Sequence, residues 1–292
     1  MGFKRLSLTF CAGYRLEGKV KKNERVGFIL KTLSDEPGKL FTLGYFCERM
    51  DAAKSSISED LLAVKHIIEA SGHGTIETIL GAGGGVLYRP DISKERCVAL
   101  QVELCKKLKD PSRVLGGGFL YTSDIMFDPR LMKEVAAFFA GRFAKLMPDC
   151  IATIETKGIP VAFLLADMLN IPLTLIRRES KLSEGSTMSI NYLTGASERV
   201  QKMSLVKRSV VPGANVVVVD DFMRGGGSVR GIADILNEAD MNVVATGIII
   251  SSVEPVRKKI DKYLPLLYLG DIDDETRKID VFPNEDFLMQ LQ

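Results

Sequence analysis

Two adjacent carboxylates and three consecutive glycines stand together in the stretch "VVVVDDFMRGGGSVRG", residues 216–231. Val216–Val219 is apolar without polar alternation, which predicts a strand buried on both faces of a parallel sheet. Asp220 and Asp221 follow at its carboxyl end, where ligands of open α/β sheets bind. Paired carboxylates in that position suit sugar hydroxyls or a metal-bound ligand.

The glycine turn predicts an anion site beside these carboxylates. Gly225–Gly227 permit a tight turn and close backbone approach, and Ser228 can cap the helix that we expect over residues 229–238. A helix N-terminus offers unpaired N–H groups and a favourable dipole to a phosphate. The stretch therefore predicts a site for a phosphorylated sugar. The alternative is an ordinary strand-turn-helix with solvated aspartates.

The order of strand, acidic pair and glycine turn resembles the motif with which type I phosphoribosyltransferases bind phosphoribosyl pyrophosphate (PRPP). The resemblance implies that the two acids hold the ribose hydroxyls and that the turn holds the 5′-phosphate. The matching residues are Asp220, Asp221, Phe222, Met223, Arg224, Gly225, Gly226, Gly227 and Ser228. Family members commonly end in Thr-Gly-x-Thr, so this chain lacks one hydroxyl and has serine for the other. Backbone amides still suit phosphate, so the change affects catalysis more than binding.

Other segments carry the same resemblance. A strand, a turn and a helix are expected over residues 150–169, and the turn resembles the family's pyrophosphate loop at Thr156, Lys157, Gly158 and Ile159. A second strand is expected over 171–180, and it ends in Arg177 and Arg178 at the same crevice. Residues 181–210 are polar and basic and resemble the flap that closes over PRPP. From this flap we expect Tyr192 to contribute to the effector site.

The first 90 residues follow a different pattern. Apolar spacing predicts helices over 23–33 and 43–52 and a third within 54–72, for which Ser56 and Glu59 form a capping box. A short helix, a turn and a longer helix indicate a helix-turn-helix, and the β-rich arms around Gly81–Gly85 indicate a wing hairpin. The expected DNA contacts are Lys22, Arg25, Lys54, Ser55, Ser56, Ser58, Lys65, Gly83 and Gly84. The alternative is a helical cap or dimerisation domain on an enzyme.

The composition of the chain limits the classes of protein to which it can belong. The 292 residues suffice for two domains, and the net charge of +2 neither favours nor excludes nucleic acid. Lys and Arg outnumber Asp and Glu in residues 1–31 and again in 177–208, which suggests two anion-facing surfaces. The 5 cysteines have no CxxC spacing and the chain has only 2 histidines, so we expect no metal site. We interpret the cysteines as free thiols, which indicates a reducing, cytoplasmic setting. No apolar run is long enough to span a membrane.

We expect an α/β protein with an N-terminal winged helix-turn-helix domain and a C-terminal type I phosphoribosyltransferase-like domain with a mostly parallel sheet. The expected boundaries are 1–20 for an extension of unknown role, 21–92 for the DNA-binding domain, 93–118 for a connection and 119–292 for the effector-binding domain.

Nearly the whole chain resembles the purine operon repressors of Gram-positive bacteria. The resemblance rests on "CERMDAAKSSISEDL" (47–61), "ETKGIP" (155–160), "EGSTMSINYLTGASERVQKMSLVKRS" (184–209) and the opening stretch. It implies a homodimer that binds the control regions of purine synthesis genes, with PRPP, either alone or together with Mg²⁺, as an effector that weakens DNA binding. It implies no catalytic cofactor and no transfer reaction.

Two other functions remain open at this point. A working purine phosphoribosyltransferase with a regulatory domain would keep the acidic pair and both phosphate loops, although no base-recognition segment is evident in residues 270–292. An RNA-binding attenuation protein with transferase activity fits the site but not the winged helix. A purine nucleotide could also compete with PRPP in the same crevice.

Overall fold

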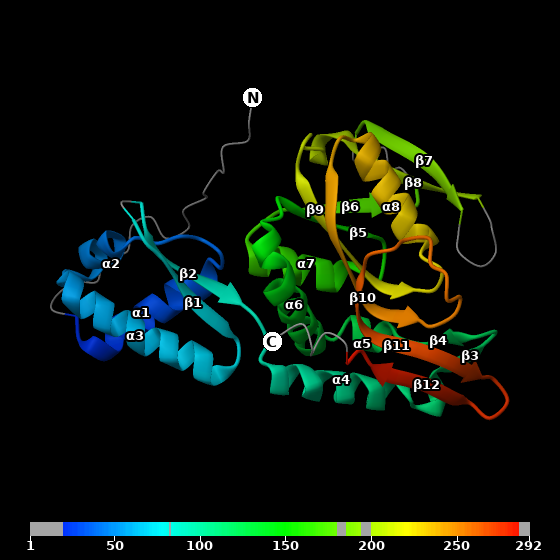
Figure 1. The fold of residues 1–292 in the computed structure, drawn as a ribbon, viewed down its shortest axis with the longest axis horizontal. Coiled ribbons are helices and arrows are strands. Elements are labelled where there is room, and N and C mark those ends of the chain that lie inside the picture. The colour runs from blue at the N-terminus through cyan, green and yellow to red at the C-terminus, as the bar shows by residue number, and fades with distance from the viewer. Residues whose placement is uncertain (1–19, 82, 180–184, 194–199, 286–292) are drawn as a thin grey trace. The chain divides into compact units, whose positions relative to one another are not determined.

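The computed structural model describes residues 20–81, 83–179, 185–193 and 200–285 of the chain. The chain divides into two compact units (Figure 1): the smaller extends to Tyr88, and the larger begins at Arg89 and also takes Gly72–Gly74. The division falls a few residues before the boundary expected after residue 92. Most of the expected N-terminal extension, residues 1–19, lies outside the described residues.

The described part of the smaller unit contains three helices and a two-stranded sheet. Its elements are α1 (Lys22–Asp35), α2 (Leu43–Met50), α3 (Lys54–Ser71), β1 (Gly74–Ile79) and β2 (Gly85–Pro90). Ile29, Phe46 and Val64, one from each helix, are fully buried in a common core. The helices and the hairpin confirm the expected winged helix-turn-helix.

Helix α3 begins earlier than the expected capping box would place it. The Ile57 N–H donates to the Ala53 carbonyl at 3.1 Å, so Ser56 already lies inside the helix. Ser58 donates its hydroxyl to the Lys54 carbonyl at 2.9 Å. The capping-box prediction is therefore wrong, because a residue with a helical backbone cannot serve as the N-cap.

The larger unit alternates strands and helices. Its strands are β3 (Val114–Gly116), β4 (Phe119–Leu120), β5 (Cys150–Ile154), β6 (Leu173–Arg177), β7 (Thr187–Leu193), β8 (Val200–Val206), β9 (Asn215–Met223), β10 (Asn242–Ser252), β11 (Leu264–Asp273) and β12 (Lys278–Pro283). Its α-helices are α4 (Lys94–Leu108), α5 (Ser123–Met126), α6 (Pro129–Phe143), α7 (Ile159–Leu169) and α8 (Gly227–Glu238). Short 3₁₀ helices cover Pro111–Arg113, Ala144–Leu146 and Lys207–Ser209.

The main sheet of the described chain has eight strands in the order β12-β11-β10-β9-β5-β6-β8-β7. The five strands from β11 to β6 run parallel, and β12, β8 and β7 pair antiparallel at the two edges. This confirms the expected mostly parallel sheet. Residues 180–184 and 194–199 of the expected flap lie outside the described residues.

Successive residues of β9 are buried in two different cores. Val217 and Val219 pack in the cluster that includes α6 and α7, whereas Val216 and Val218 pack in the cluster that includes α8. Helices therefore cover both faces of the sheet (Figure 1). Burial on both sides explains why the sequence of this strand shows no polar alternation.

The segment expected to be a connection contains a helix of the larger unit's core. In α4, Leu100 and Leu104 are buried in the same cluster as residues of β11 and β12. The Gln101 side-chain amide donates to the carbonyls of Leu266, at 2.8 Å, and Asn284, at 3.1 Å. Residues 94–108 thus fold onto the sheet instead of forming a linker.

Candidate functional site

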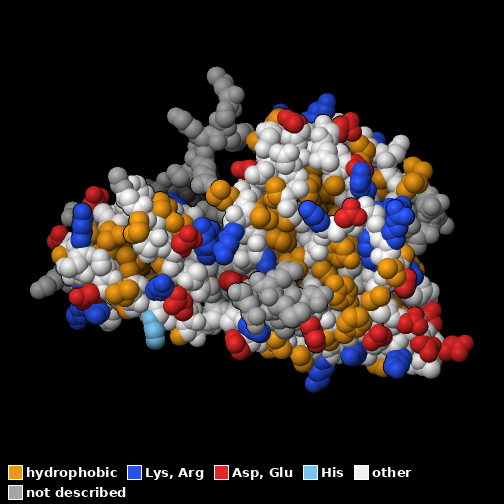
Figure 2. All heavy atoms as spheres, in the orientation of Figure 1, with side chains coloured by type: hydrophobic (Ala, Val, Ile, Leu, Met, Phe, Trp, Pro, Cys, Tyr) orange, Lys and Arg blue, Asp and Glu red, His pale blue; other side chains and the backbone are white. Residues whose placement is uncertain are grey.

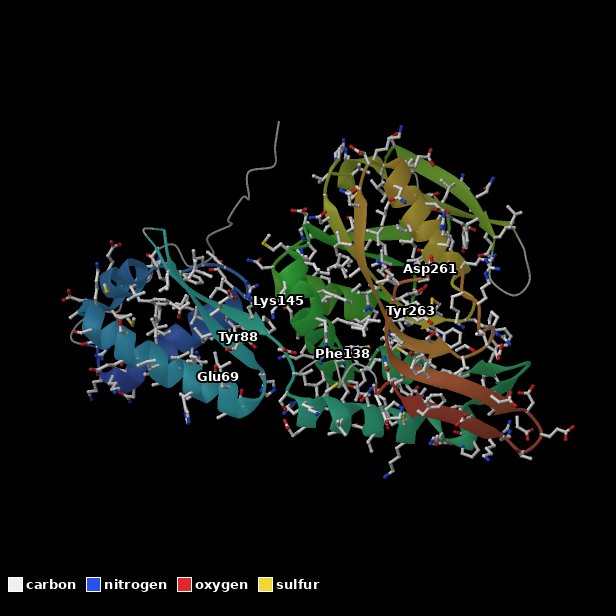
Figure 3. All side chains as sticks on the ribbon, viewed as in Figure 1. Glu69, Tyr88, Phe138, Lys145, Asp261 and Tyr263 are labelled. Carbon is white, nitrogen blue, oxygen red and sulfur yellow. The ribbon has the colours of Figure 1, made fainter. Side chains whose placement is uncertain are left out.

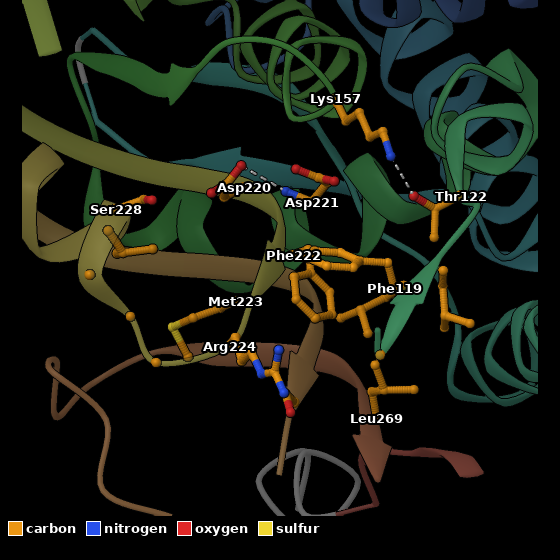
Figure 4. Close-up of a pocket in the computed structure, with 18 of the residues that line it drawn as sticks. Phe119, Thr122, Lys157, Asp220, Asp221, Phe222, Met223, Arg224, Ser228 and Leu269 are labelled. Carbon is orange, nitrogen blue, oxygen red and sulfur yellow. Dashed lines mark hydrogen bonds between the residues drawn. The ribbon is translucent and has the colours of Figure 1, made fainter. Parts of the chain in front are cut away.

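A cavity of about 1020 Å³ opens at the carboxyl ends of the central strands. Its walls come from segments far apart in the sequence, which the parallel sheet brings to one edge. The described lining residues fall in 117–122, 154–157, 220–229, 250–254 and 269–272, together with Arg178. The whole stretch from Asp220 to Ser228 lines the cavity (Figure 4).

The carboxylates of Asp220 and Asp221 have little contact with solvent. Asp220 is 5% exposed, and its Oδ1 accepts the backbone N–H of Asp221 at 3.0 Å. Burial raises the pKa of Asp220 well above its ordinary value, and the neighbouring Asp221 charge adds to this. Burial raises the pKa of Asp221 too, although its hydrogen bond with Asp220 and the Lys157 charge oppose the shift. Two such carboxylates favour a ligand that brings hydroxyl donors or a cation.

The glycine turn leaves the start of α8 open. Gly226 is the N-cap residue with φ of 80°, and no described side chain caps the helix. The first N–H groups of α8 are therefore free to meet an anion, and the helix dipole favours one there. Ser228 lies in the first turn, so the prediction that it caps the helix is wrong, although it does line the cavity.

The loop between β5 and α7 forms the opposite wall. Thr156 and Lys157 line the cavity, and the peptide bond between Glu155 and Thr156 is cis. Lys157 Nζ donates to Thr122 Oγ1 at 3.1 Å, across the cavity from the glycine turn (Figure 4). Gly158 and Ile159, expected in the pyrophosphate loop, lie outside the described lining.

The three residues expected from β6 and the flap lie near one another, but only one of them lines the cavity. Arg178 lines the cavity, and its backbone N–H donates to Glu155 Oε1 at 2.8 Å. The Arg177 guanidinium donates to Glu155 Oε2 at 3.1 Å. Tyr192 is 6% exposed and donates its hydroxyl to Gln201 Oε1 at 2.8 Å. Arg177 is outside the described lining, because neighbouring residues of a strand point to opposite faces and Arg178 takes the cavity side. Tyr192 is also outside it, because its ring packs in the core cluster that includes α8.

The cavity also contains two aromatic rings, and the sequence pointed to neither as a base-binding group. Phe119, 65% exposed, and Phe222, 39% exposed, both line the cavity and lie side by side in the close-up (Figure 4). Phe119 follows Gly116–Gly118, which all have positive φ. The three glycines are the feature of the sequence that could have pointed to this part of the cavity, because successive glycines permit a tight turn.

The hairpin that carries Phe119 is tied to an acidic turn. The Gly117 N–H donates to Asp274 Oδ2 at 2.7 Å. Asp274 and Glu275 lie between β11 and β12, next to Asp273 at the end of β11, where carboxylates gather on the surface of the larger unit (Figure 2). The contact fixes the wall of the cavity that the glycine run forms.

The residues expected to touch DNA are mostly exposed in the smaller unit. Lys22, Lys54, Ser55, Ser58, Lys65 and Gly83 are exposed, whereas Ser56 and Gly84 are half-buried. A Cβ atom at Gly84 would lie 2.2 Å from the Ile79 carbonyl oxygen, so the wing turn requires glycine there.

Arg25 has a different role from the one expected. Its Nε donates to Asp60 Oδ2 at 2.6 Å, and Asp60 is fully buried. Its guanidinium also donates to the Val20 carbonyl at 3.1 Å. Arg25 therefore joins α1 to α3 inside the unit, and each of its three nitrogens donates to Asp60 or to the Val20 carbonyl.

Comparison with known proteins agrees with this architecture. The family model described as "Bacterial purine repressor, N-terminal" matches residues 21–90, and the one described as "Phosphoribosyl transferase domain" matches residues 122–273. The chain is 38% identical over 270 residues to the purine biosynthesis transcriptional repressor PurR of Bacillus subtilis strain 168, spanning 92% of this chain and 94% of that protein. The chain belongs to this family of bacterial purine regulators.

The relatives include a transcriptional activator as well as a repressor, and they also include enzymes. The purine biosynthesis transcriptional activator PurR of Lactococcus lactis subsp. lactis strain IL1403 is 36% identical over 262 residues, spanning 90% of this chain and 97% of that protein. A xanthine phosphoribosyltransferase of Oenococcus oeni is 29% identical over 174 residues, spanning 58% and 84%. The crystal structure of adenine phosphoribosyltransferase from Rhodothermus marinus covers 59% of this chain and 99% of its own, with a TM-score of 0.50 and 18% identity. This likeness confirms the fold of the larger unit.

Two further properties concern the residues that the structure describes. None of their helices combines the length and apolarity needed to cross a membrane. They also contain no group of three or more His, Cys, Asp or Glu side chains that could hold a metal ion.

Proposed function

We propose that the protein is a DNA-binding regulator of purine biosynthesis genes and that PRPP, bound in the cavity, weakens its binding to DNA. One observation carries the proposal: the same chain contains a winged helix-turn-helix and a cavity that joins a buried acid pair to an uncapped helix N-terminus. The family membership supports the regulatory role, and the chemistry of the cavity supports the effector.

Each part of PRPP has a group in the cavity whose chemistry suits it, which supports the proposal. The amides of the glycine turn and the start of α8 suit the 5′-phosphate. Asp220 and Asp221 suit the two ribose hydroxyls. Buried carboxylates with few hydrogen-bond donors around them are stabilised when the hydroxyls of a ligand donate to them. The loop at Thr156 and Lys157 then lies where the pyrophosphate would be, with the Lys157 ammonium supplying positive charge.

Mg²⁺ fits this arrangement as a companion of the effector. Mg²⁺ is usually bound by one or two carboxylates together with ligand phosphates and water. The acid pair supplies carboxylate oxygens, and the pyrophosphate would supply the others. The chain's own contribution is to hold the two carboxylates ready at the ribose.

We further propose that the site senses PRPP without transferring its ribose. The glycine turn lacks the hydroxyl that transferases commonly carry at residue 225 and has serine at 228. The relatives that match nearly the whole chain are named transcriptional regulators. The enzyme alternative keeps its support from the xanthine phosphoribosyltransferase relatives, and it predicts nucleotide formation from a purine base.

The aromatic rings favour a second ligand, a purine nucleotide that competes with PRPP. Phe119 and Phe222 offer exposed faces beside the ribose site, where a base attached to the ribose would stack. The acid pair and the phosphate turn serve such a nucleotide equally well. Binding of a nucleotide would therefore displace PRPP.

We propose that the DNA-bound form is a homodimer, because helix-turn-helix proteins commonly read two half-sites with two-fold symmetry. For PRPP to weaken DNA binding, it must bind the DNA-free form more tightly than the DNA-bound form. A complete switch from one form to the other needs a preference of about 10⁴-fold, or about 5.5 kcal/mol.

The test is a titration of the complex between the protein and labelled DNA from a purine gene control region. PRPP with Mg²⁺ should release the DNA from the wild-type protein. The double variant Asp220→Ala/Asp221→Ala should bind the DNA and ignore PRPP. If PRPP leaves DNA binding unchanged while adenine, guanine or xanthine is converted to its nucleotide, the protein is an enzyme and the proposal is wrong.

A further inference from the structure

The segment between β10 and β11, residues 253–263, lies against the glycine turn. Ile260 and Tyr263 pack on the core cluster that contains Met223 and Val229. Figure 3 labels Tyr263 and the nearby Asp261 in this segment. A Cβ atom on Gly226 would lie 3.4 Å from the Lys259 nitrogen and 3.5 Å from Ile260 Cγ1. The segment is thus anchored in the core and supports the outer side of the turn.

Lys258 is the polar centre of this contact. Its ammonium donates to the carbonyls of Arg224, at 2.6 Å, Ser252, at 2.6 Å, and Val253, at 3.3 Å. An ammonium has three donors, so these bonds use all of them. Partial burial lowers the pKa of Lys258. Lys258 joins the glycine turn to the end of β10 and does not reach for a ligand.

A second bond from the same segment acts on the next peptide of the turn. The Lys259 N–H donates to the Gly225 carbonyl at 2.9 Å. The carbonyls of Arg224 and Gly225 are therefore both held toward residues 258 and 259. In a trans peptide the N–H points opposite to the carbonyl. The N–H groups of Gly225 and Gly226 consequently point away from the segment, on the side where the turn lines the cavity.

We propose that Lys258 is a positioning residue for the anion-binding turn, which orients the amides of Gly225 and Gly226 by holding the Arg224 carbonyl. This inference rests on the proposed function, because it assigns these amides to the 5′-phosphate of PRPP. Its consequence is specific: Lys258 affects the part of the ligand that the glycine turn binds and leaves the pyrophosphate loop alone.

The experiment uses the full-length protein and the substitution Lys258→Met, which keeps the length of the side chain and removes the ammonium. Lys262→Met is the matched control, because Lys262 is exposed in the same segment. Titration calorimetry measures the binding of three probes: PRPP, ribose 5-phosphate and pyrophosphate, each with Mg²⁺. We expect Lys258→Met to weaken the binding of PRPP and of ribose 5-phosphate by a similar factor of about 10 or more. This factor corresponds to the loss of one or two hydrogen bonds to a charged group. Pyrophosphate binding and the Lys262→Met protein should match the wild type.

The outcomes separate this inference from the proposed function. If the wild-type protein fails to bind PRPP, the proposed function fails and this inference with it. If the wild type binds PRPP and Lys258→Met binds ribose 5-phosphate equally well, only this inference is overturned. An equal loss of pyrophosphate and ribose 5-phosphate also overturns it, because that result indicates general damage to the cavity. Should Lys258→Met fail to fold, Lys258→Gln provides the same comparison, because its side-chain amide keeps two donors. For this variant we expect a smaller loss of affinity, confined to ribose 5-phosphate and PRPP.

Discussion

Gly158 packs so tightly against Asp220 that a Cβ atom on residue 158 would lie 2.9 Å from the Asp220 Oδ1 atom. The same Cβ atom would lie 2.5 Å from Thr153 Oγ1, a buried hydroxyl that has no hydrogen-bond partner among the described residues. The loop after β5 and the acidic pair on β9 therefore fit together only when residue 158 has no side chain. A ligand that bridges loop and acids depends on this contact.

Gly158→Ala should reduce both stability and PRPP binding. The added methyl group must push Thr153 or Asp220 aside, and overpacking of this kind typically costs about 1–3 kcal/mol. Denaturant unfolding and calorimetry measure the two effects. Gly27→Ala is the control: no atom lies within 4 Å of a Cβ there, so alanine should stabilise α1 by up to about 1 kcal/mol. Equal behaviour of the two variants would refute the role of the contact.

The acidic pair should make the free energy of unfolding depend on pH. Burial raises the pKa values of Asp220 and Asp221 in the folded chain, so the folded chain binds protons more tightly than the unfolded chain. Their contribution to stability is therefore largest in acid, and it declines as the pH rises from about 4 through the folded pKa values. Asp220→Asn removes this penalty. The variant should be more stable than the wild type near neutral pH, and the difference should shrink toward pH 4.

Urea unfolding at a series of pH values measures this difference. Asp234→Asn on the exposed face of α8 is the control and should show no such trend, because the Arg230–Asp234 ion pair is solvent-exposed. A stability advantage of Asp220→Asn that stays constant with pH would show that the carboxylate is ordinarily solvated.

The ion pair of Arg25 with Asp60 should be essential to the smaller unit. Arg25→Met leaves the Asp60 carboxylate buried without its partner, and breaking a buried pair in this way costs about 3–5 kcal/mol. Lys31→Met removes an exposed pair with Asp35 on the same helix and should cost at most about 1 kcal/mol. Thermal unfolding followed by circular dichroism compares them. A small cost for Arg25→Met would return this residue to the candidates for direct DNA contact.

Lys54 at the start of α3 should bind DNA phosphate. Lys54→Ala should weaken binding by a similar factor on every DNA sequence and reduce the slope of log affinity against log salt by about 1. Lys133→Ala, an exposed lysine of the larger unit, is the matched control and should leave the slope unchanged. A change in sequence preference with an unchanged slope would instead indicate contact with a base edge.

The aromatic rings of the cavity should matter for nucleotides and not for PRPP. Phe119→Ala should weaken competition by AMP or GMP by about 1–3 kcal/mol, the usual contribution of stacking between a base and an aromatic side chain. PRPP has no base, so its own affinity should stay within about twofold of the wild type. Competition titrations against labelled PRPP measure both. Equal losses for PRPP and nucleotide would mean that Phe119 shapes the cavity and does not stack on a base.

The sequence predicts those parts of the site that lie within one short stretch. The valines, the acidic pair and the glycines of 216–231 are neighbours in the chain, so their order specifies strand, acids and turn. Phe119 lines the cavity and Lys258 contacts the glycine turn only because the fold brings segments distant in the sequence together. Local patterns also misjudge helix starts, because a helix can begin without a capping side chain: α3 begins with the bond from the Ile57 N–H to the Ala53 carbonyl, and the N-cap residue of α8 is Gly226.

The most direct test of the account compares the affinity of PRPP for the free protein with its affinity for the protein–DNA complex. Coupling between two ligands is reciprocal, so DNA must weaken PRPP binding by the same factor by which PRPP weakens DNA binding. The account predicts two equal factors that both disappear in Asp220→Ala/Asp221→Ala. An unchanged PRPP affinity in the presence of saturating DNA would contradict it, since the cavity and the DNA-binding unit would then act independently.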